Sequence, residues 1–141
     1  MKITIFSDGG ARGNPGPAGI GAVLFDADKQ KLAEVSEYIG ETTNNQAEYL
    51  ALLAGLQKAT ELSATEVMMF LDSKLVVEQI AGRWKIKDLE MRKLAEKVHA
   101  VLQGFSSWEI HHVPREKNQL ADQLANRALD ARGFTKSAPR F

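Results

Sequence analysis

Apolar residues recur along this chain with two different periods, and the change of period marks the predicted elements. Over the first forty residues the apolar positions favour strands at 2–8, 19–25 and 31–39. A Gly/Pro-rich loop follows the first strand, and a short polar turn precedes the third. Strands joined by such short connections are most simply arranged as an antiparallel meander.

From Thr43 onward the period becomes helical. Tyr49, Leu52, Leu56 and other apolar residues repeat at helical spacing and predict a helix that ends at about Leu62. Thr43 and Gln46 have the spacing of a capping box, in which the hydroxyl and the amide satisfy free backbone N–H groups. The helix is therefore expected to begin at Thr43.

The second half of the chain alternates strands with helices. Such alternation after a meander predicts an α/β fold, a mixed sheet in which the first, fourth and fifth strands run parallel. Residues 1–132 are expected to form one domain, and the polar segment 133–141 a C-terminal tail. The predicted elements are strands at 65–71 and 108–113 and helices at 73–82, 88–102 and 118–131, the last capped by Asn118.

The composition limits the kinds of binding site that the chain can form. The chain has 18 basic and 18 acidic residues and no cysteine, which excludes disulfides and thiolate metal sites and leaves oxygen or histidine ligands. A formal charge of zero argues against binding through a global positive field, although a local basic face is still possible. No apolar run approaches the roughly 18 residues that span a bilayer. The N-terminal segment reads as a core strand, so we expect a cytoplasmic protein without membrane contact.

Two aspartates come at the ends of predicted parallel strands. Asp8 and Asp72 would lie side by side if the first and fourth strands are neighbours, because parallel strands end at the same sheet edge. Desolvated carboxylates repel one another, and a divalent cation such as Mg²⁺ or Mn²⁺ would resolve this repulsion. The alternative is that Asp8 only starts a turn, as Asp-Gly often does.

Two further acids, Glu48 and Asp122, lie early in predicted helices. Four carboxylates suit two hard cations about 4 Å apart, the arrangement used for phosphodiester hydrolysis. The alternative is that each acid merely stabilises the positive end of its helix dipole.

Four motifs in sequence order give the chain a family resemblance. They are Asp8-Gly-Gly with Gly13-Asn-Pro-Gly-Pro, Thr43-Asn-Asn-Gln-Ala-Glu48, Leu71-Asp72-Ser73 and Asn118-Gln-Leu-Ala-Asp122. Over about residues 2–129 the chain resembles type 1 ribonuclease H in its short-loop form. The resemblance implies a five-stranded mixed sheet with helices on both faces. It also implies a metal-dependent endonuclease that hydrolyses the RNA strand of RNA–DNA hybrids and leaves 5′-phosphate and 3′-hydroxyl ends.

The resemblance also implies roles for particular residues. Two Mg²⁺ ions, with Mn²⁺ as a possible substitute, would be held by the catalytic acids Asp8, Glu48, Asp72 and Asp122. The amides of Asn14, Asn44 and Asn45 would face the minor groove and read ribose 2′-hydroxyls. Gly9 and Gly10 would let the protein backbone approach the RNA strand, and Thr43, at a helix start, would bind a phosphate of the DNA strand.

The chain departs from the family pattern in several places. The loop at 113–118 is short and lacks the histidine of many members, so Arg115 is the nearest replacement and would stabilise phosphate charge or help product leave. His111 and His112 lie on the preceding strand, one on each face. Glu41 stands where many members place an arginine in the phosphate pocket. The basic protrusion is missing, and Trp84 in the short connector either meets the nucleic-acid backbone or anchors the core.

The expected partner is the RNA–DNA hybrid, bound weakly and in a salt-sensitive manner by a monomer with no obligate protein partner; whether double-stranded RNA is also cut stays open. Two competing functions share the fold: a non-catalytic nucleic-acid binding module, and a nuclease or integrase acting on DNA. The four acids argue against the first, and the asparagines argue against the second.

Overall fold

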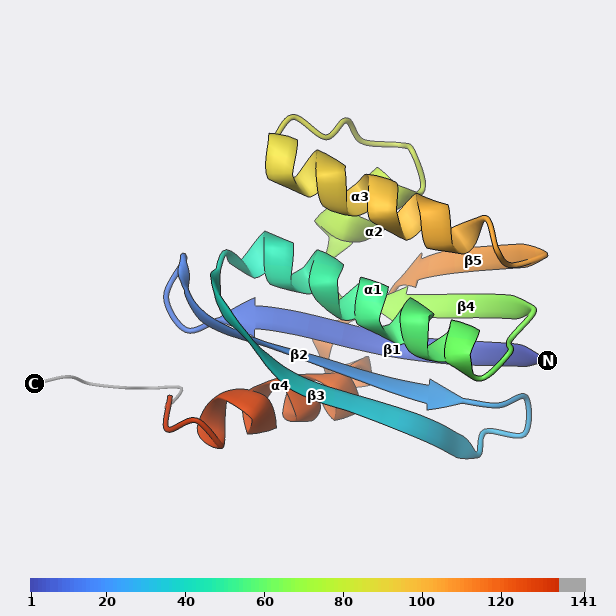
Figure 1. The fold of residues 1–141 in the computed structure, drawn as a ribbon, viewed down its shortest axis with the longest axis horizontal. Helices are drawn as coiled ribbons and strands as arrows, with labels where there is room; N and C mark the ends of the chain where they lie inside the picture. The colour runs from blue at the N-terminus through green and yellow to red at the C-terminus, as the bar shows by residue number, and fades with distance from the viewer. Residues whose placement is uncertain (135–141) are drawn as a thin grey trace, which may run out of the picture.

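The computed structural model describes residues 1–134, built around a five-stranded sheet in the order β3-β2-β1-β4-β5 (Figure 1). Residues 135–141, most of the expected tail, lie outside the described part. The strands are β1 (Lys2–Ala11), β2 (Gly16–Phe25), β3 (Lys31–Thr42), β4 (Glu66–Leu71) and β5 (Ser107–His112). The helices are α1 (Asn44–Glu61), α2 (Lys74–Ile80), α3 (Leu89–Leu102) and α4 (Gln119–Asp130), with a 3₁₀ turn at Arg115–Lys117.

The central strand is β1, which pairs antiparallel with β2 and parallel with β4. Its alternating residues Ile3 and Ile5 point to the same face of the sheet, and both are fully buried. β3 extends the meander and β5 runs parallel to β4. The predicted mixed sheet is therefore confirmed, including its meander and its parallel strands.

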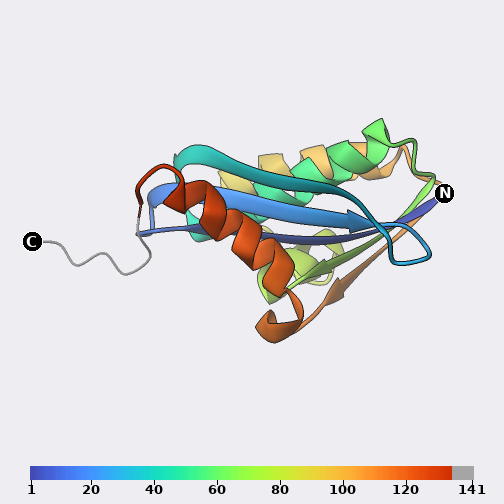
Figure 2. The ribbon, with the colours of Figure 1, turned by 90° about the horizontal axis from the view of Figure 1, so that it is seen from below.

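Helices cover both faces of the sheet, as predicted. α1 and α3 pack together on one face, and α4 crosses the other face over β1, β2 and β3 (Figure 2). α4 sits very close to β2, because a Cβ atom at Gly21 would lie 2.3 Å from the carbonyl oxygen of Ala121. Any larger side chain at Gly21 would push α4, and Asp122 with it, away from the sheet.

The predicted strand at 2–8 ends too early. The strand continues past Asp8 to Ala11, because Gly9, Gly10 and Ala11 pair with β2 in extended conformation. The pairing with β4, however, stops at Ser7 and Leu71. Asp8 therefore lies inside a strand but at the end of the parallel ladder, which still opens the sheet edge beside it.

α1 and α4 begin where the sequence predicts, but their capping differs from the prediction at two residues. The Thr43 side chain caps α1 by accepting from the backbone N–H of Gln46 at 3.2 Å. The Gln46 side chain does not complete the capping box, because its oxygen pairs with the hydroxyl of Thr42. Asn118 precedes α4 but makes no side-chain cap, so its predicted capping role is wrong.

No helix within residues 1–134 combines the length and the apolar character needed to cross a membrane.

Candidate active site

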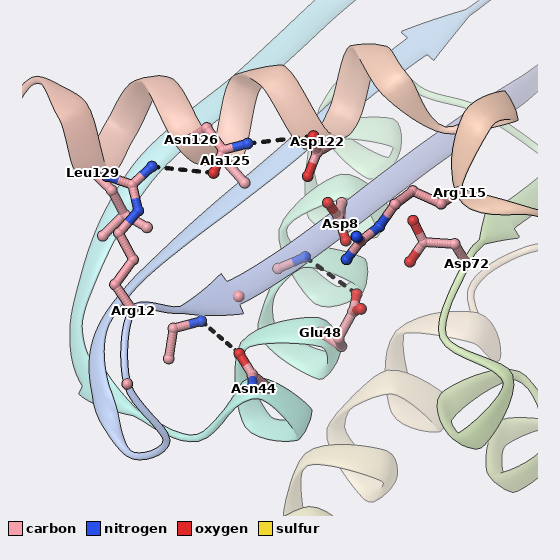
Figure 3. A pocket seen from close by; sticks show the side chains of 14 residues that line it. Asp8, Arg12, Asn44, Glu48, Asp72, Arg115, Asp122, Ala125, Asn126 and Leu129 are labelled. Carbon is pink, nitrogen blue, oxygen red and sulfur yellow. Dashed lines mark hydrogen bonds between the residues drawn. The ribbon is translucent and has the colours of Figure 1, made fainter. Parts of the chain in front are cut away.

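Three carboxylates from separate elements converge at one end of the sheet. Asp8 comes from β1, Glu48 from the second turn of α1, and Asp72 directly follows β4. One oxygen from each lies within 4.8 Å of the others. They line an open pocket of about 450 Å³ in which the acidic groups face one another (Figure 3). The structure thus places Asp8 and Asp72 side by side, as the sheet topology predicted.

The fourth acid approaches from the opposite face of the sheet. Asp122 projects from α4 into the same pocket, where its proximity contributes to the raised pKa of Asp8. It does not belong to the tight group formed by the other three. The pocket therefore holds a triad of acids with a fourth beside it.

Crowding makes these acids hard to ionise without a counter-ion. Burial, followed by the nearby charge of Asp72 and the hydrogen bond and charge of Asp122, raises the pKa of Asp8 from 3.8 to about 8. Arg115 acts in the opposite direction, by lowering it. Burial and then the charges of Asp8 and Asp72 raise the pKa of Glu48 well above its ordinary value, against the lowering effect of the Gly9 N–H. Within residues 1–134 no ion pair joins any of the four acids to a lysine or arginine.

Close packing of β1 on α1 fixes Glu48. A Cβ atom at Gly9 would lie 2.2 Å from the carbonyl oxygen of Ala47, so only glycine allows this approach. The N–H of Gly9 then donates to Oε1 of Glu48 at 3.1 Å. Gly9, directly after Asp8, thus brings Glu48 close to Asp8.

The Asn118 side chain bonds to β1 and to Asp72, which explains why it does not cap α4. Its buried Nδ2 donates to the backbone oxygen of Ser7 at 2.9 Å and to Oδ2 of Asp72 at 3.4 Å. It therefore ties β1 to the acid that follows β4. The sequence motif contained Asn118, but its spacing suggested only a helix cap.

The predicted substrate residues occupy the rim unevenly. Gly9, Gly10 and Asn44 line the pocket, whereas Asn14, Asn45 and Thr43 do not. The side-chain oxygen of Asn44 accepts from the N–H of Ala11 at 2.7 Å, and that of Asn14 accepts from the N–H of Asn44 at 2.9 Å. These bonds fasten the loop after β1 to the start of α1.

Arg115 lies on the exposed 3₁₀ turn and lines the pocket beside Asp8 (Figure 3). Two further residues that sequence reasoning overlooked, Arg12 and Asn126, also line it. The available signal was that Asn126 follows Asp122 by four residues, which places both side chains on one helix face.

None of the remaining candidates, His111, His112, Trp84 and Glu41, lines the pocket. His111 stacks on Phe70 with ring centres 5.4 Å apart and contacts Glu109 at 3.0 Å. Trp84 is 44% exposed, which rules out the core-anchor alternative, and Nζ of Lys74 lies 5.9 Å from its ring. Glu41 is an exposed residue of β3.

Comparison with known proteins identifies the relatives of this chain. A family model described as "Reverse transcriptase-like" matches residues 6–128. The bifunctional protein Rv2228c of Mycobacterium tuberculosis is 50% identical over 139 residues, which cover 98% of this chain but only 38% of that protein. A ribonuclease H of Alcanivorax borkumensis is 33% identical, with 92% of each chain covered.

Solved structures agree with the sequence matches. LC11-RNase H1, whose crystal structure holds an RNA/DNA hybrid, is 42% identical and superposes with a TM-score of 0.88 over 92% of this chain and 98% of its own. This chain therefore spans a whole solved domain, yet well under half the length of the mycobacterial relative.

Proposed function

The chain belongs to the ribonuclease H family, and we propose on that premise that it cleaves the RNA strand of RNA–DNA hybrids endonucleolytically, leaving 5′-phosphate and 3′-hydroxyl ends. The observation that carries the proposal is the convergence of Asp8, Glu48 and Asp72 in an open pocket, with Asp122 beside them. The relative that holds an RNA/DNA hybrid supports the same substrate class.

Members of this family depend on divalent metal ions, and the donor set here fits such ions. The four acids supply only oxygen ligands, and burial and mutual repulsion raise the pKa of Asp8 to about 8, which a bound cation would reverse. We propose that Asp8, Glu48, Asp72 and Asp122 hold two Mg²⁺ ions and accept Mn²⁺ instead. When bound, the ions would supply an activated water and charge stabilisation at the leaving oxygen.

The protein's own part is to hold these acids in place. Glu48 is fixed by the N–H of Gly9, and Asp72 by the amide of Asn118. Arg115 brings a permanent positive charge to the rim, where it would stabilise phosphate charge or assist product release. An arginine does not serve as a general base near neutral pH.

Discrimination of RNA from DNA would fall to the asparagine amides. Asn14 and Asn44 use their side-chain oxygens within the protein, so their NH₂ groups are the donors left for ribose 2′-hydroxyls. Asn45 is exposed next to them, and Gly9 and Gly10 leave space for the RNA backbone. Thr43 at the start of α1 would contact a phosphate of the DNA strand.

We further propose that the enzyme acts as a monomer in the cytoplasm. The four acids on which the proposed mechanism depends all come from a single chain. The mycobacterial and Alcanivorax relatives are bacterial proteins, and bacterial nucleic acids lie in the cytoplasm.

The test is cleavage of an end-labelled RNA–DNA hybrid with Mg²⁺, Mn²⁺ or chelator, beside double-stranded RNA and double-stranded DNA. We expect metal-dependent cutting of the RNA strand of the hybrid alone, lost in Asp72→Asn and retained in Asp28→Asn, an exposed residue of the β2–β3 turn. Binding of the hybrid without cutting would indicate a binding module. Preference for either homoduplex would refute the proposal.

A further inference from the structure

A chain of polar contacts runs along α4 from the pocket to the loop after β1. Asn126 donates from Nδ2 to Oδ2 of Asp122 at 3.3 Å, one turn earlier on the helix. Oδ1 of Asn126 accepts from Nη2 of Arg12 at 3.1 Å, and Nη1 of Arg12 donates to Oδ1 of Asp130 at 2.7 Å. Figure 3 shows Arg12 reaching across to Asn126 and Asn126 reaching toward Asp122.

The donor-only chemistry of arginine determines how Asn126 is turned. A guanidinium has five N–H donors and no acceptor, so Arg12 bonds only to the oxygen of the Asn126 amide. The NH₂ group of Asn126 must then face Asp122. Arg12 therefore makes Asn126 a donor toward the fourth acid.

The contacts of Arg12 contribute little to the stability of the fold, so stability alone does not account for them. The Arg12 side chain is 11% exposed, whereas that of its charged partner Asp130 is 61% exposed, and an ion pair so open to water contributes little. Nε of Arg12 is buried without a hydrogen-bond partner within the described residues, which costs free energy. The backbone N–H of Arg12 bonds to the oxygen of Pro17 at 2.8 Å, so the loop fixes where the guanidinium starts.

Asp122 needs such support more than the other acids do. Glu48 and Asp72 accept hydrogen bonds from Gly9 and Asn118, whereas Asp122 lies outside the tight triad and accepts its side-chain hydrogen bond from Asn126. A bond from Asn126 to Oδ2 restrains rotation of the Asp122 carboxylate. Its other oxygen is then left for the pocket.

We propose that Asn126 is a positioning residue for Asp122, and that Arg12 fixes the amide orientation through which Asn126 acts. The inference rests on the proposed nuclease function. It adds a device that links the loop carrying Asn14 to the fourth acid.

The decisive variant is Asn126→Asp, which keeps the shape and the acceptor for Arg12 but replaces the donor toward Asp122 with a second carboxylate. Loss of a group that orients a metal-binding acid typically lowers activity about 10- to 100-fold. We expect that loss in kcat, with KM for the hybrid within about twofold. Arg12→Met should lower kcat in the same way but less, and Arg127→Met, which removes a 64%-exposed arginine from the same helix, should not.

A second measurement does not depend on turnover. In ¹⁵N–¹H spectra of the metal-free protein, the side-chain NH₂ signals of Asn126, assigned by their absence in Asn126→Asp, should shift in Arg12→Met and in Asp122→Asn but not in Arg127→Met. Thermal melts establish that each variant is folded.

The outcomes separate the two proposals. The positioning role would be overturned by an unchanged kcat in Asn126→Asp, or by Asn126 NH₂ signals that do not shift in Asp122→Asn. A rise in KM with unchanged kcat would overturn it in favour of direct substrate contact. If the unaltered protein cuts no hybrid, the proposed function fails, while the spectra still decide whether Arg12 and Asn126 orient Asp122.

Discussion

Asp8→Asn should make the metal-free protein more stable at pH 8. In the fold the pKa of Asp8 is raised to about 8 from 3.8, so ionising this carboxyl opposes folding. At about 1.4 kcal/mol per pKa unit, the shift sets an upper limit of about 6 kcal/mol. Rotation of the acids into the open pocket and entry of water reduce this cost, and we expect a gain of about 1–3 kcal/mol.

The pH dependence identifies the cause. Because the pKa in the folded state lies above that of the unfolded chain, the contribution of Asp8 to stability is fully present below about pH 4 and is lost as pH rises toward 8. The unaltered protein should therefore lose stability over this range in chelator. Asp8→Asn lacks the titrating group, so its advantage should shrink at pH 4.5.

Urea and thermal unfolding followed by circular dichroism, in chelator at pH 4.5 and pH 8, provide the measurement. For a domain of this size the gain at pH 8 corresponds to about 3–10 °C in Tm. Asp28→Asn removes the same charge from an exposed turn and serves as the control. An equal gain at both pH values, or a loss at pH 8, would refute the electrostatic explanation.

Three further changes test other parts of the site. Arg115→Ala should lower kcat about 10- to 100-fold without abolishing cleavage, as expected for losing one charged contact to phosphate; single-turnover rates equal to wild type would contradict its placement. Asn118→Leu should cost about 1–3 kcal/mol in urea unfolding, because the oxygen of Ser7 loses its buried donor; unchanged stability would exclude that bond as a support. Gly9→Ala should destabilise the protein by about 1–3 kcal/mol or more through overpacking, whereas Gly10→Ala, whose Cβ would come no closer than 3.8 Å to its nearest neighbour, should not.

The sequence predicted the sheet well because its strongest signals are local. Alternation in the first forty residues and the helical period from Thr43 each involve neighbours in the chain, and the structure confirms both. Topology then placed Asp8 beside Asp72, since parallel strands end at one edge.

The sequence-based predictions fail where contacts between residues far apart in the chain determine the local structure. Gly9 and Gly10 look like a turn in sequence, but they continue β1 because both pair with β2, and α1 packs so close to Gly9 that no larger side chain fits there. Asn118 looks like a helix cap, but the oxygen of Ser7, 111 residues earlier, takes its amide. Arg12 and Asn126 carried no motif at all, and only the docking of α4 brings them together. The assignment of metal and substrate contacts to individual residues stays a prediction.

The position of α4 has a consequence for how the protein is made. Synthesis from the N-terminus delivers Asp8, Glu48 and Asp72 early, whereas Asp122 arrives only with α4, which closes the sheet face over Gly19 and Gly21. A nascent or truncated chain that stops before residue 119 would contain three of the four acids and leave that face bare. The full set of proposed catalytic acids thus forms only once translation has passed α4, so unfinished chains would lack a complete site for cutting nucleic acid.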